Sequence, residues 1–443
     1  MLLSEISDIA LCRLFIFYND AMGRMTSETK GEWNMRKGIS LFLLFLLIIT
    51  SLSGCNITTT TDLWDGAIAE SFAGGNGTQK KPFIIDKASQ LAFLASDVNS
   101  GNNYEGKYFK LNCDIDLNYI EWTPIGNGIN SFSGVFDGDG HTIYHLKIVS
   151  GATFEAKISS VMYNQYATGL FGSISNATIK NTNIDEVDIN IQDQVDIPIV
   201  SVGVLAGKVY FENATEISNV KISNAVIKAD FEKKTKTSEV NVGGVIGYAY
   251  NGEETESNLF QMIQVQSDVQ VFIENKGGGG NNIGGIAGTL FVPNHGNIQD
   301  CASYITISLT NYYHINNYFG AFGFLETLNT FSISNMYSKT TVNKIHDYFG
   351  IHHPAYTANV IAGLISPSPI SPYNSYNFEN VFGFIEQIDP DTNTQVNSIT
   401  LHDLPSEELY TSTNCQGCEQ LPENHGFNKR IWNLDNPSAP KLK

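Results

Sequence analysis

The sequence is short of positive charge. Its 443 residues contain 26 Lys and Arg against 45 Asp and Glu, which leaves a formal net charge of −19. Contacts to phosphate supply most of the affinity of proteins for nucleic acid, and this chain has no basic surface with which to make them. The composition therefore excludes nucleic acid as a main partner.

Arginine and the common catalytic motifs are also scarce. Arg430 is the one arginine after residue 55, whereas enzymes that grip carboxylates or phosphates usually use several. None of the nine His is followed by Glu, so the HExxH zinc motif is missing, and no Gly-x-Ser-x-Gly elbow or Walker loop occurs. We therefore expect no enzyme activity, no metal site and no cofactor.

The chain is nevertheless too apolar to be disordered. Charged residues make up 16% of it and hydrophobic residues 42%, a balance that favours a packed core. The 39 glycines are free to adopt left-handed backbone conformations, so we expect many tight turns.

A long hydrophobic run is missing at the N-terminus. The apolar stretch over residues 39 to 49 falls short of the roughly 20 residues that a membrane span needs. It follows Arg36 and Lys37 and precedes small residues, which is typical of a secretion signal. We predict a signal peptide over residues 35 to 54, beginning at Met35, with residues 1 to 34 a mis-called start that the mature protein lacks.

The end of this signal resembles the lipobox of bacterial lipoproteins. The matching residues are Leu52, Ser53, Gly54 and Cys55. The resemblance implies that Cys55 is acylated and becomes the first residue of the mature chain. It also implies a lipid anchor in the membrane, a tether over residues 55 to 61, and a location at the bacterial cell surface or outer membrane.

Few cysteines remain. Cys113 alternates with apolar residues and Cys301 has similar surroundings, so both are predicted to be core thiols. Cys415 and Cys418 form a lone CxxC pattern, for which we predict a disulfide because disulfides persist outside the cytoplasm. Half of a metal site and a redox pair are the alternatives.

Residues 62 to 150 are predicted to form an N-terminal cap and first coil. A short apolar run begins at Phe83, and an amphipathic helix follows with Leu91, Leu94 and Val98 on one face. We expect Asp86 to cap this helix. From residue 108 the apolar period changes to two, which indicates strands with one buried face.

The rest of the chain is repetitive. Glycine-rich segments begin at Gly169, Gly203, Gly243, Gly284, Gly320, Ala362 and Val381. Several precede a ladder of Ile, Asn and Val that starts at Ile174, Ile217, Ile298 and Ile333. Such a repeat cannot bury its apolar face alone and must stack on its neighbours. The sequence thus predicts an all-β solenoid, with Gly203, Gly244 and Gly285 at equivalent positions.

These segments resemble the GLUG-motif repeats of bacterial surface proteins, over residues 151 to 400. Trp64-Asp65-Gly66 and the segment from Trp122 to Gly126 are similar to the module that precedes such repeats, and residues 401 to 443 resemble its closing segment. The resemblance implies a right-handed parallel β-helix at the cell surface. It does not imply one activity.

Three acidic patterns could carry chemistry. The DGDG sequence that starts at Asp137 begins like a calcium loop but lacks the later acidic ligand, so a tight turn is predicted. Asp114 and Asp116 share one face of a strand, as the carboxylates of a retaining glycosidase do, but ordinary solvated positions are favoured. The acidic run comprises Asp185, Glu186, Asp188, Asp193 and Asp196, and a solvated strand edge is favoured over calcium binding.

Aromatic and histidine residues gather between residues 312 and 356. Such side chains suit an interface because they offer rigid amphipathic area, although they could instead cover the flanks of the solenoid. The candidate binding residues are Tyr312, Tyr313, His314, Tyr348, His352, His353 and Tyr356. We therefore predict adhesin-like binding of an extracellular glycan or protein. A passive envelope component and a carbohydrate-active β-helix enzyme, either a lyase or a glycoside hydrolase, are the alternatives.

The lipobox leads to a direct prediction. Cys55→Ser should abolish membrane anchoring, because serine has no thiol to which the lipid can be attached. Metabolic labelling with a fatty acid, followed by fractionation of membranes, measures this. Equal labelling of the wild type and the variant would show that Cys55 is not the anchor.

Overall fold

The computed structural model divides the chain into two units, Met1–Ile57 and Thr58–Lys443, and all described residues belong to the second. They are residues 63–149, 152–158, 161–192, 199–211, 213–231, 239–251, 259–275, 280–292, 295–311, 317–327, 330–347, 356–358, 362–367, 375–388, 395–402, 432–433 and 441–442. No helix among them is long and apolar enough to cross a membrane.

The helix that the sequence predicts is present near the start of the second unit. Helix α3 (Ala88–Asn99) follows strand β1 (Phe83–Ile85) and buries Leu91, Leu94 and Val98. The prediction that Asp86 caps it is wrong. The N-cap is Lys87, without a side-chain cap, because Gln90 reaches back and accepts a hydrogen bond from the Asp86 backbone N–H at 2.8 Å.

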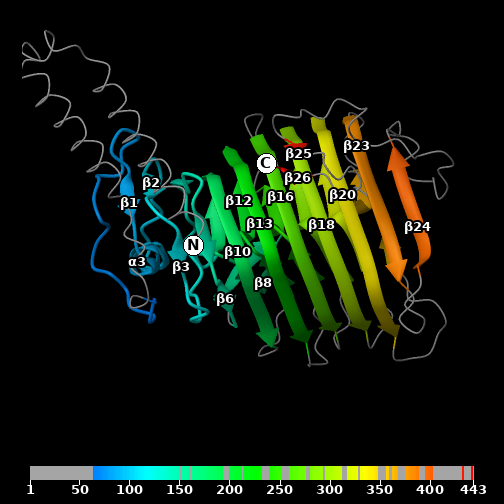
Figure 1. The fold of residues 1–443 in the computed structure, drawn as a ribbon, viewed down its shortest axis with the longest axis horizontal. Helices are drawn as coiled ribbons and strands as arrows, with labels where there is room; N and C mark the ends of the chain where they lie inside the picture. Colours follow the sequence, from blue (N-terminus) through cyan, green and yellow to red (C-terminus); the bar gives the residue numbers. More distant parts are fainter. Residues whose placement is uncertain are drawn as a thin grey trace, which may run out of the picture. The chain divides into compact units, whose positions relative to one another are not determined.

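The largest sheet is a stack of long parallel strands, which Figure 1 shows side by side. Its path runs through β1, β2 (Tyr108–Leu111), β4 (Val135–Asp137), β10 (Thr178–Gln192), β13 (Ala214–Phe231), β16 (Leu259–Asn275), β18 (His295–Asn311), β20 (Thr330–Asp347), β23 (Ser375–Ile388) and β24 (Gln395–His402). The short strands β3 (Ile115–Asp116), β5 (Thr142–Tyr144) and β6 (Lys147–Ile148) join it at the cap. Strand β24 pairs antiparallel to β23 and ends the path.

A second sheet is built from the glycine-rich segments. Its strands are β7 (Ala152–Ile158), β8 (Val161–Thr168), β9 (Phe171–Ser175), β11 (Ile199–Gly203), β12 (Ala206–Phe211), β14 (Glu239–Gly243), β15 (Ile246–Asn251), β17 (Gly280–Val292), β19 (Asn317–Thr327), β21 (Tyr356–Ala358) and β22 (Ala362–Pro367). All pairings in it are parallel except that of the β7–β8 hairpin. A separate antiparallel pair, β25 (Trp432–Asn433) and β26 (Lys441–Leu442), comes last.

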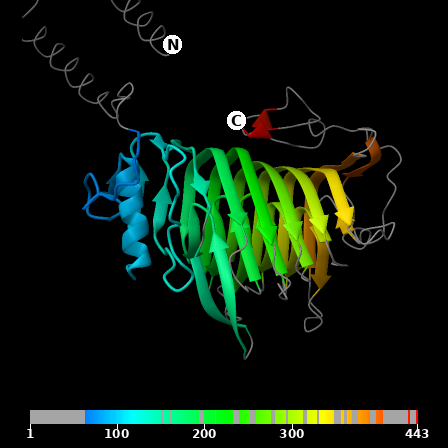
Figure 2. The ribbon, with the colours of Figure 1, turned by 90° about the horizontal axis from the view of Figure 1, so that it is seen from below.

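The chain alternates between the two sheets, so each repeat contributes to both, as the two sets of arrows in Figure 2 show. Core side chains meet between them: the rings of Phe211 in β12 and Phe260 in β16 lie 5.5 Å apart. The predicted all-β parallel solenoid is confirmed. Stacking satisfies the backbone hydrogen bonds of each coil through its neighbours, which a single repeat could not do.

The predicted ladder is also present, with one change of register. Ile217, Ile298 and Ile333 lie in one buried row that runs through Met262. In the first long strand the row is occupied by Ile179 instead of Ile174, which lies in β9. The sequence contains Ile at both positions, so its pattern alone could not separate them.

The glycines stack in two rows, and the predicted equivalence of Gly203, Gly244 and Gly285 is wrong by one residue. Gly203 pairs with Gly243, which pairs with Gly284. The second row consists of Gly172, Gly207, Gly247, Gly288, Gly323 and Gly363, as the neighbouring pairs require. The segment at Val381 belongs to β23 in the large sheet and is not part of either row.

The second glycine row permits a close approach of backbones. A Cβ on Gly247 would overlap the Val202 backbone nitrogen, and one on Gly288 would overlap that of Val242. The strand segments that contain Gly247 and Gly288 thus pack directly on the segments that contain Val202 and Val242. This contact requires glycine because there is no room for a side chain, whatever the backbone angles.

Residues with left-handed backbone angles, most of them Asn, form one corner of the long strands, and Gln264 and Asp300 are the other members of this row. Asn181, Asn219 and Asn335 share one row and have φ values near +50°, where Asn is tolerated better than most residues. The Asn219 amide donates to the Asn181 side-chain oxygen at 2.9 Å, which links two coils along the corner. These side chains therefore shape the coil and also tie it to the next one.

The glycine contact predicts a position-specific loss of stability. Gly288→Ala should lower the free energy of unfolding by about 1 to 3 kcal/mol or more, because the added Cβ overlaps backbone on both sides. Gly74→Ala is the control, since a Cβ there has open space around it, and it should change stability by less than about 0.5 kcal/mol. Chemical denaturation of both variants measures the difference, and equal effects would contradict the packing described.

Candidate functional site

A histidine and a glutamate occupy a corner at which the next coil carries Asn. His145 lies between β5 and β6 with φ +57°, and Glu186 in β10 has φ +56°. Asn224 in β13 follows in the same row with φ +49°. Glu rarely adopts this conformation, and where such a residue does, the strain often accompanies a specific interaction.

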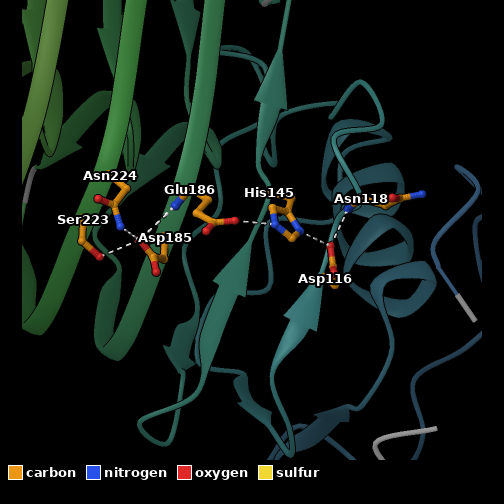
Figure 3. Close-up of polar contacts among 7 residues, drawn as sticks. All are labelled: Asp116, Asn118, His145, Asp185, Glu186, Ser223 and Asn224. Carbon is orange, nitrogen blue, oxygen red and sulfur yellow. Dashed lines mark hydrogen bonds and ion pairs between the residues drawn. The ribbon is translucent and has the colours of Figure 1, made fainter. Parts of the chain in front are cut away.

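That interaction is a bridge of charged groups that links strands β3 and β10 through the β5–β6 connection, drawn in Figure 3. The His145 ring binds Asp116 of β3 through Nδ1 at 2.7 Å and Glu186 of β10 through Nε2 at 2.5 Å. The backbone N–H of Asn118 donates to the same Asp116 oxygen at 2.7 Å. We call Asp116, His145 and Glu186 the histidine bridge, because they connect the cap to the first long strand.

The bridge continues to the next coil through Asp185. Its carboxylate accepts hydrogen bonds from the Ser223 hydroxyl and the Asn224 amide, both at 2.8 Å, and from the Glu186 backbone N–H at 3.0 Å. Two residues of the acidic run, Asp185 and Glu186, therefore form contacts between coils. The prediction of a solvated strand edge is too simple for them. Asp193 and Asp196 lie outside the described residues.

The two carboxylates control the protonation of the histidine. Burial by itself would lower the pKa of His145, but the hydrogen bonds and charges of Asp116 and Glu186 outweigh it, so this pKa is raised above its usual value. Burial, followed by the charge of Glu186, raises the pKa of the neighbouring Tyr119, whose ring centroid lies 4.6 Å from that of His145. The charged form of His145 is the one that the site favours.

The other predicted acids have separate partners. Asp114 accepts hydrogen bonds from the Thr142 backbone N–H at 2.9 Å and contacts His141 at 3.2 Å, so it does not form a carboxylate pair with Asp116. The DGDG segment is the predicted turn between β4 and β5, and Asp139 in it forms a 2.8 Å ion pair with Lys110. No group of His, Cys, Asp or Glu within the described ranges is arranged to hold a metal ion.

A second cluster lies on the smaller sheet. In β12, Val209 and Phe211 point into the core, so Lys208 and Tyr210 point to the opposite face. Tyr248 and Tyr250 of β15 pair in register with these two residues. We call Lys208, Tyr210, Tyr248 and Tyr250 the tyrosine cluster.

The side chains of the cluster contact each other closely. The Tyr250 ring centroid lies 5.1 Å from that of Tyr210 and 5.4 Å from that of Tyr248. The Lys208 ammonium lies 4.9 Å from the centre of the Tyr250 ring, within the range of a cation–π contact. The three tyrosines are half-buried, whereas Lys208 is only 4% exposed.

Polar residues from the strands before the glycine turns meet this cluster. Thr289 continues the row of Lys208 and Tyr248, and it hydrogen-bonds with Asn241 and with Asn282, the latter at 3.0 Å. The Asn282 amide also donates to the Glu239 carboxylate at 2.9 Å. Hydrogen-bonding groups therefore adjoin the rings, as in a surface that recognises an amphipathic ligand.

Burial perturbs the charged groups here. It lowers the pKa of Lys208 to about 8 and raises that of Tyr250 to about 12. Burial also raises the pKa of Glu239, although the hydrogen bonds from Asn241, Thr289 and Asn282 oppose this. Burial, followed by the charges of Glu239, Tyr250 and Glu326, raises the pKa of Tyr248.

Most residues predicted from the sequence to bind a ligand lie outside the described residues. This holds for Tyr312, Tyr313, His314, Tyr348, His352 and His353, and equally for Cys55, Cys415 and Cys418. Tyr356 begins strand β21, where its backbone pairs with Asn317. The predicted core thiols Cys113 and Cys301 are both buried, and burial raises the pKa of Cys301 to about 12.

The comparisons with known proteins give no family. No family model matches the chain. A segment of 80 residues is 39% identical to a protein of Evansella cellulosilytica provisionally named a Gly-rich membrane protein, and 209 residues are 27% identical to Halomucin of Haloquadratum walsbyi. These segments span 16% and 44% of this chain but only 8% and 2% of the two relatives.

One solved structure is similar in outline. It is a protein of Bacteroides ovatus provisionally named an immunoglobulin A1 protease, with a TM-score of 0.46 and 19% identity. The match covers 84% of this chain and 95% of that one. A likeness at this level carries no statement about activity.

Sequence reasoning missed the tyrosine cluster. A local signal was present. Lys208-Val209-Tyr210 and Tyr248-Ala249-Tyr250 each follow a glycine segment, and in each an apolar residue separates two larger side chains, the second of which is Tyr. The register between the two repeats, which makes the four side chains neighbours, is visible only in the fold.

The histidine bridge predicts a pH-dependent stability. Because the folded-state pKa of His145 is raised above the unfolded value near 6.5, its contribution is fully present below pH about 6.5 and disappears as the pH rises through the folded pKa. His145→Gln should therefore lower the free energy of unfolding more at pH about 5.5 than at pH about 8.5. Denaturation at the two pH values measures this.

The control for this experiment is His295→Gln, since His295 is exposed at the start of β18. It should show no comparable difference between the two pH values. A loss for His145→Gln that is the same at both pH values would mean that the charge on the ring contributes nothing to the bridge.

Proposed function

We propose that this protein is a lipid-anchored β-solenoid of the bacterial cell surface, related to the GLUG-motif proteins, that binds an extracellular glycan or protein in the manner of an adhesin. The tyrosine cluster is the observation that carries the proposal. It presents three half-buried tyrosines on the face of the sheet that points away from the core. Rings with polar tips at such positions are typical of recognition surfaces.

The surface location rests on the lipobox pattern around Cys55 and agrees with the name of the Evansella relative, which refers to a membrane protein. Binding without turnover is favoured over catalysis by the chemistry of the two clusters. The histidine bridge uses both of its carboxylates to hold His145, and a base or nucleophile committed in this way is poorly available to a substrate.

A binding assay with the full chain in detergent micelles tests the proposal. The protein should bind at least one member of an array of glycans and extracellular proteins, and the bound ligand should be recovered without cleavage. The double variant Tyr210→Ala with Tyr250→Ala should weaken this binding by at least about tenfold, as expected for aromatic hot spots. No saturable binding in any arm, or cleavage of the ligand, would overturn the proposed function.

A further inference from the structure

We infer that the ligand of the tyrosine cluster is a neutral glycan chain that runs along the stack of coils. This inference rests on the proposed function and names the ligand class of the same site. It follows from three properties of the cluster: the regular spacing of its rings, the acceptors beside them and the balance of its charges.

The first property is the spacing. Tyr210 and Tyr250 lie in register on adjacent strands, and Phe291 of β17 follows Leu290, the partner of Ala249. Three successive strands therefore each present one half-buried ring, at the spacing of about 4.8 Å between paired strands, and Ser175 and Glu326 occupy the same row on either side of them. A linear ligand with a short repeat meets an equivalent ring at each step, which a folded protein surface does not.

The second property is the supply of polar groups beside the rings. The carboxylate of Glu239, which begins strand β14, accepts a hydrogen bond from the Asn282 amide at 2.9 Å and offers one acceptor. Glu326 lies in register with Phe291 and offers a second one. Sugars present apolar C–H faces that stack on aromatic rings and hydroxyl groups that donate to such oxygens.

The third property is the charge. The site combines one cation, Lys208, with the carboxylates Glu239 and Glu326, and the whole chain carries −19. A polyanionic glycan would meet this negative potential, and its attraction to Lys208 is weakened because that ammonium already faces the Tyr250 ring. A neutral chain avoids this repulsion.

The experiment compares three classes of probe with the full chain in detergent micelles. They are neutral oligosaccharides of glucose, mannose or N-acetylglucosamine, anionic polysaccharides such as polygalacturonate and alginate, and an array of extracellular proteins. We expect saturable binding of a neutral oligosaccharide, measured by calorimetry, with an affinity that changes less than about threefold between about 50 mM and about 500 mM NaCl. Binding should strengthen with chain length until the row of rings is covered.

Variants then locate the ligand. Tyr250→Ala should weaken the affinity for the neutral oligosaccharide by at least about tenfold. Tyr250→Phe, which keeps the ring, should retain most of that affinity. Glu239→Gln should weaken it without loss of the ring surface. Phe272→Ala is the matched control, because Phe272 is an exposed aromatic residue on the other sheet, 39% accessible, and should leave binding unchanged.

The outcomes separate the two proposals. Binding of only anionic polysaccharides or only proteins, weakened by Tyr250→Ala, would overturn the neutral glycan and keep the adhesin-like function. Binding of a neutral glycan that neither Tyr250→Ala nor Glu239→Gln changes would overturn this site. Absence of binding in every class would overturn both. Melting curves of each variant show that the losses occur in folded protein.

Discussion

The close approach of backbones at the second glycine row is the contact on which the smaller sheet depends. Gly247 and Gly288 lie against backbone atoms of Val202 and Val242, at a distance that any side chain would prevent. The dispersion attraction of each atom pair is small, but summed over the many pairs of such a contact it helps to hold the two strand segments at a fixed separation. As a result, Thr289 after the turn can reach Asn282 before it, and the register of one coil passes to the next. Both the scaffold and the tyrosine cluster therefore require glycine at these positions.

Parallel stacking converts a local sequence pattern into a continuous surface. Within one repeat, Lys208 and Tyr210 are simply two residues that alternate with core positions. Because β12 and β15 pair in register, the same positions of the next repeat bring Tyr248 and Tyr250 beside them. The core rows are restricted to apolar residues such as Ile217 and Ile298, whereas the outward rows vary with little effect on packing. A solenoid can therefore change its ligand without changing its fold.

The fold was predictable from the sequence because its signals are local and repeated. The helix face of Leu91, Leu94 and Val98 and the row of Ile217, Ile298 and Ile333 follow from apolar periodicity alone. The register was less accessible: Gly243 and Gly244 are adjacent and chemically identical, and only the pairing with Gly203 shows which belongs to the row. The histidine bridge was not predictable, because Asp116, His145 and Glu186 come from separate strands. Nothing in their spacing indicates that they meet.

The corner row shows how a polar interaction can be added to such a scaffold. Asn is suited to the left-handed corner because its short amide hydrogen-bonds locally, so the row tolerates Asn224 at little cost. Replacing Asn by His and Glu adds strain at two adjacent coils, but the same geometry directs the His145 ring toward Glu186 on one side and Asp116 on the other. Both ring nitrogens can donate to the two carboxylates only while the ring is charged. The first corner of the stack, where the cap meets the repeats, is thus held by an interaction that depends on the charge of His145, whereas Asn224 in the next coil donates a hydrogen bond to the Asp185 carboxylate.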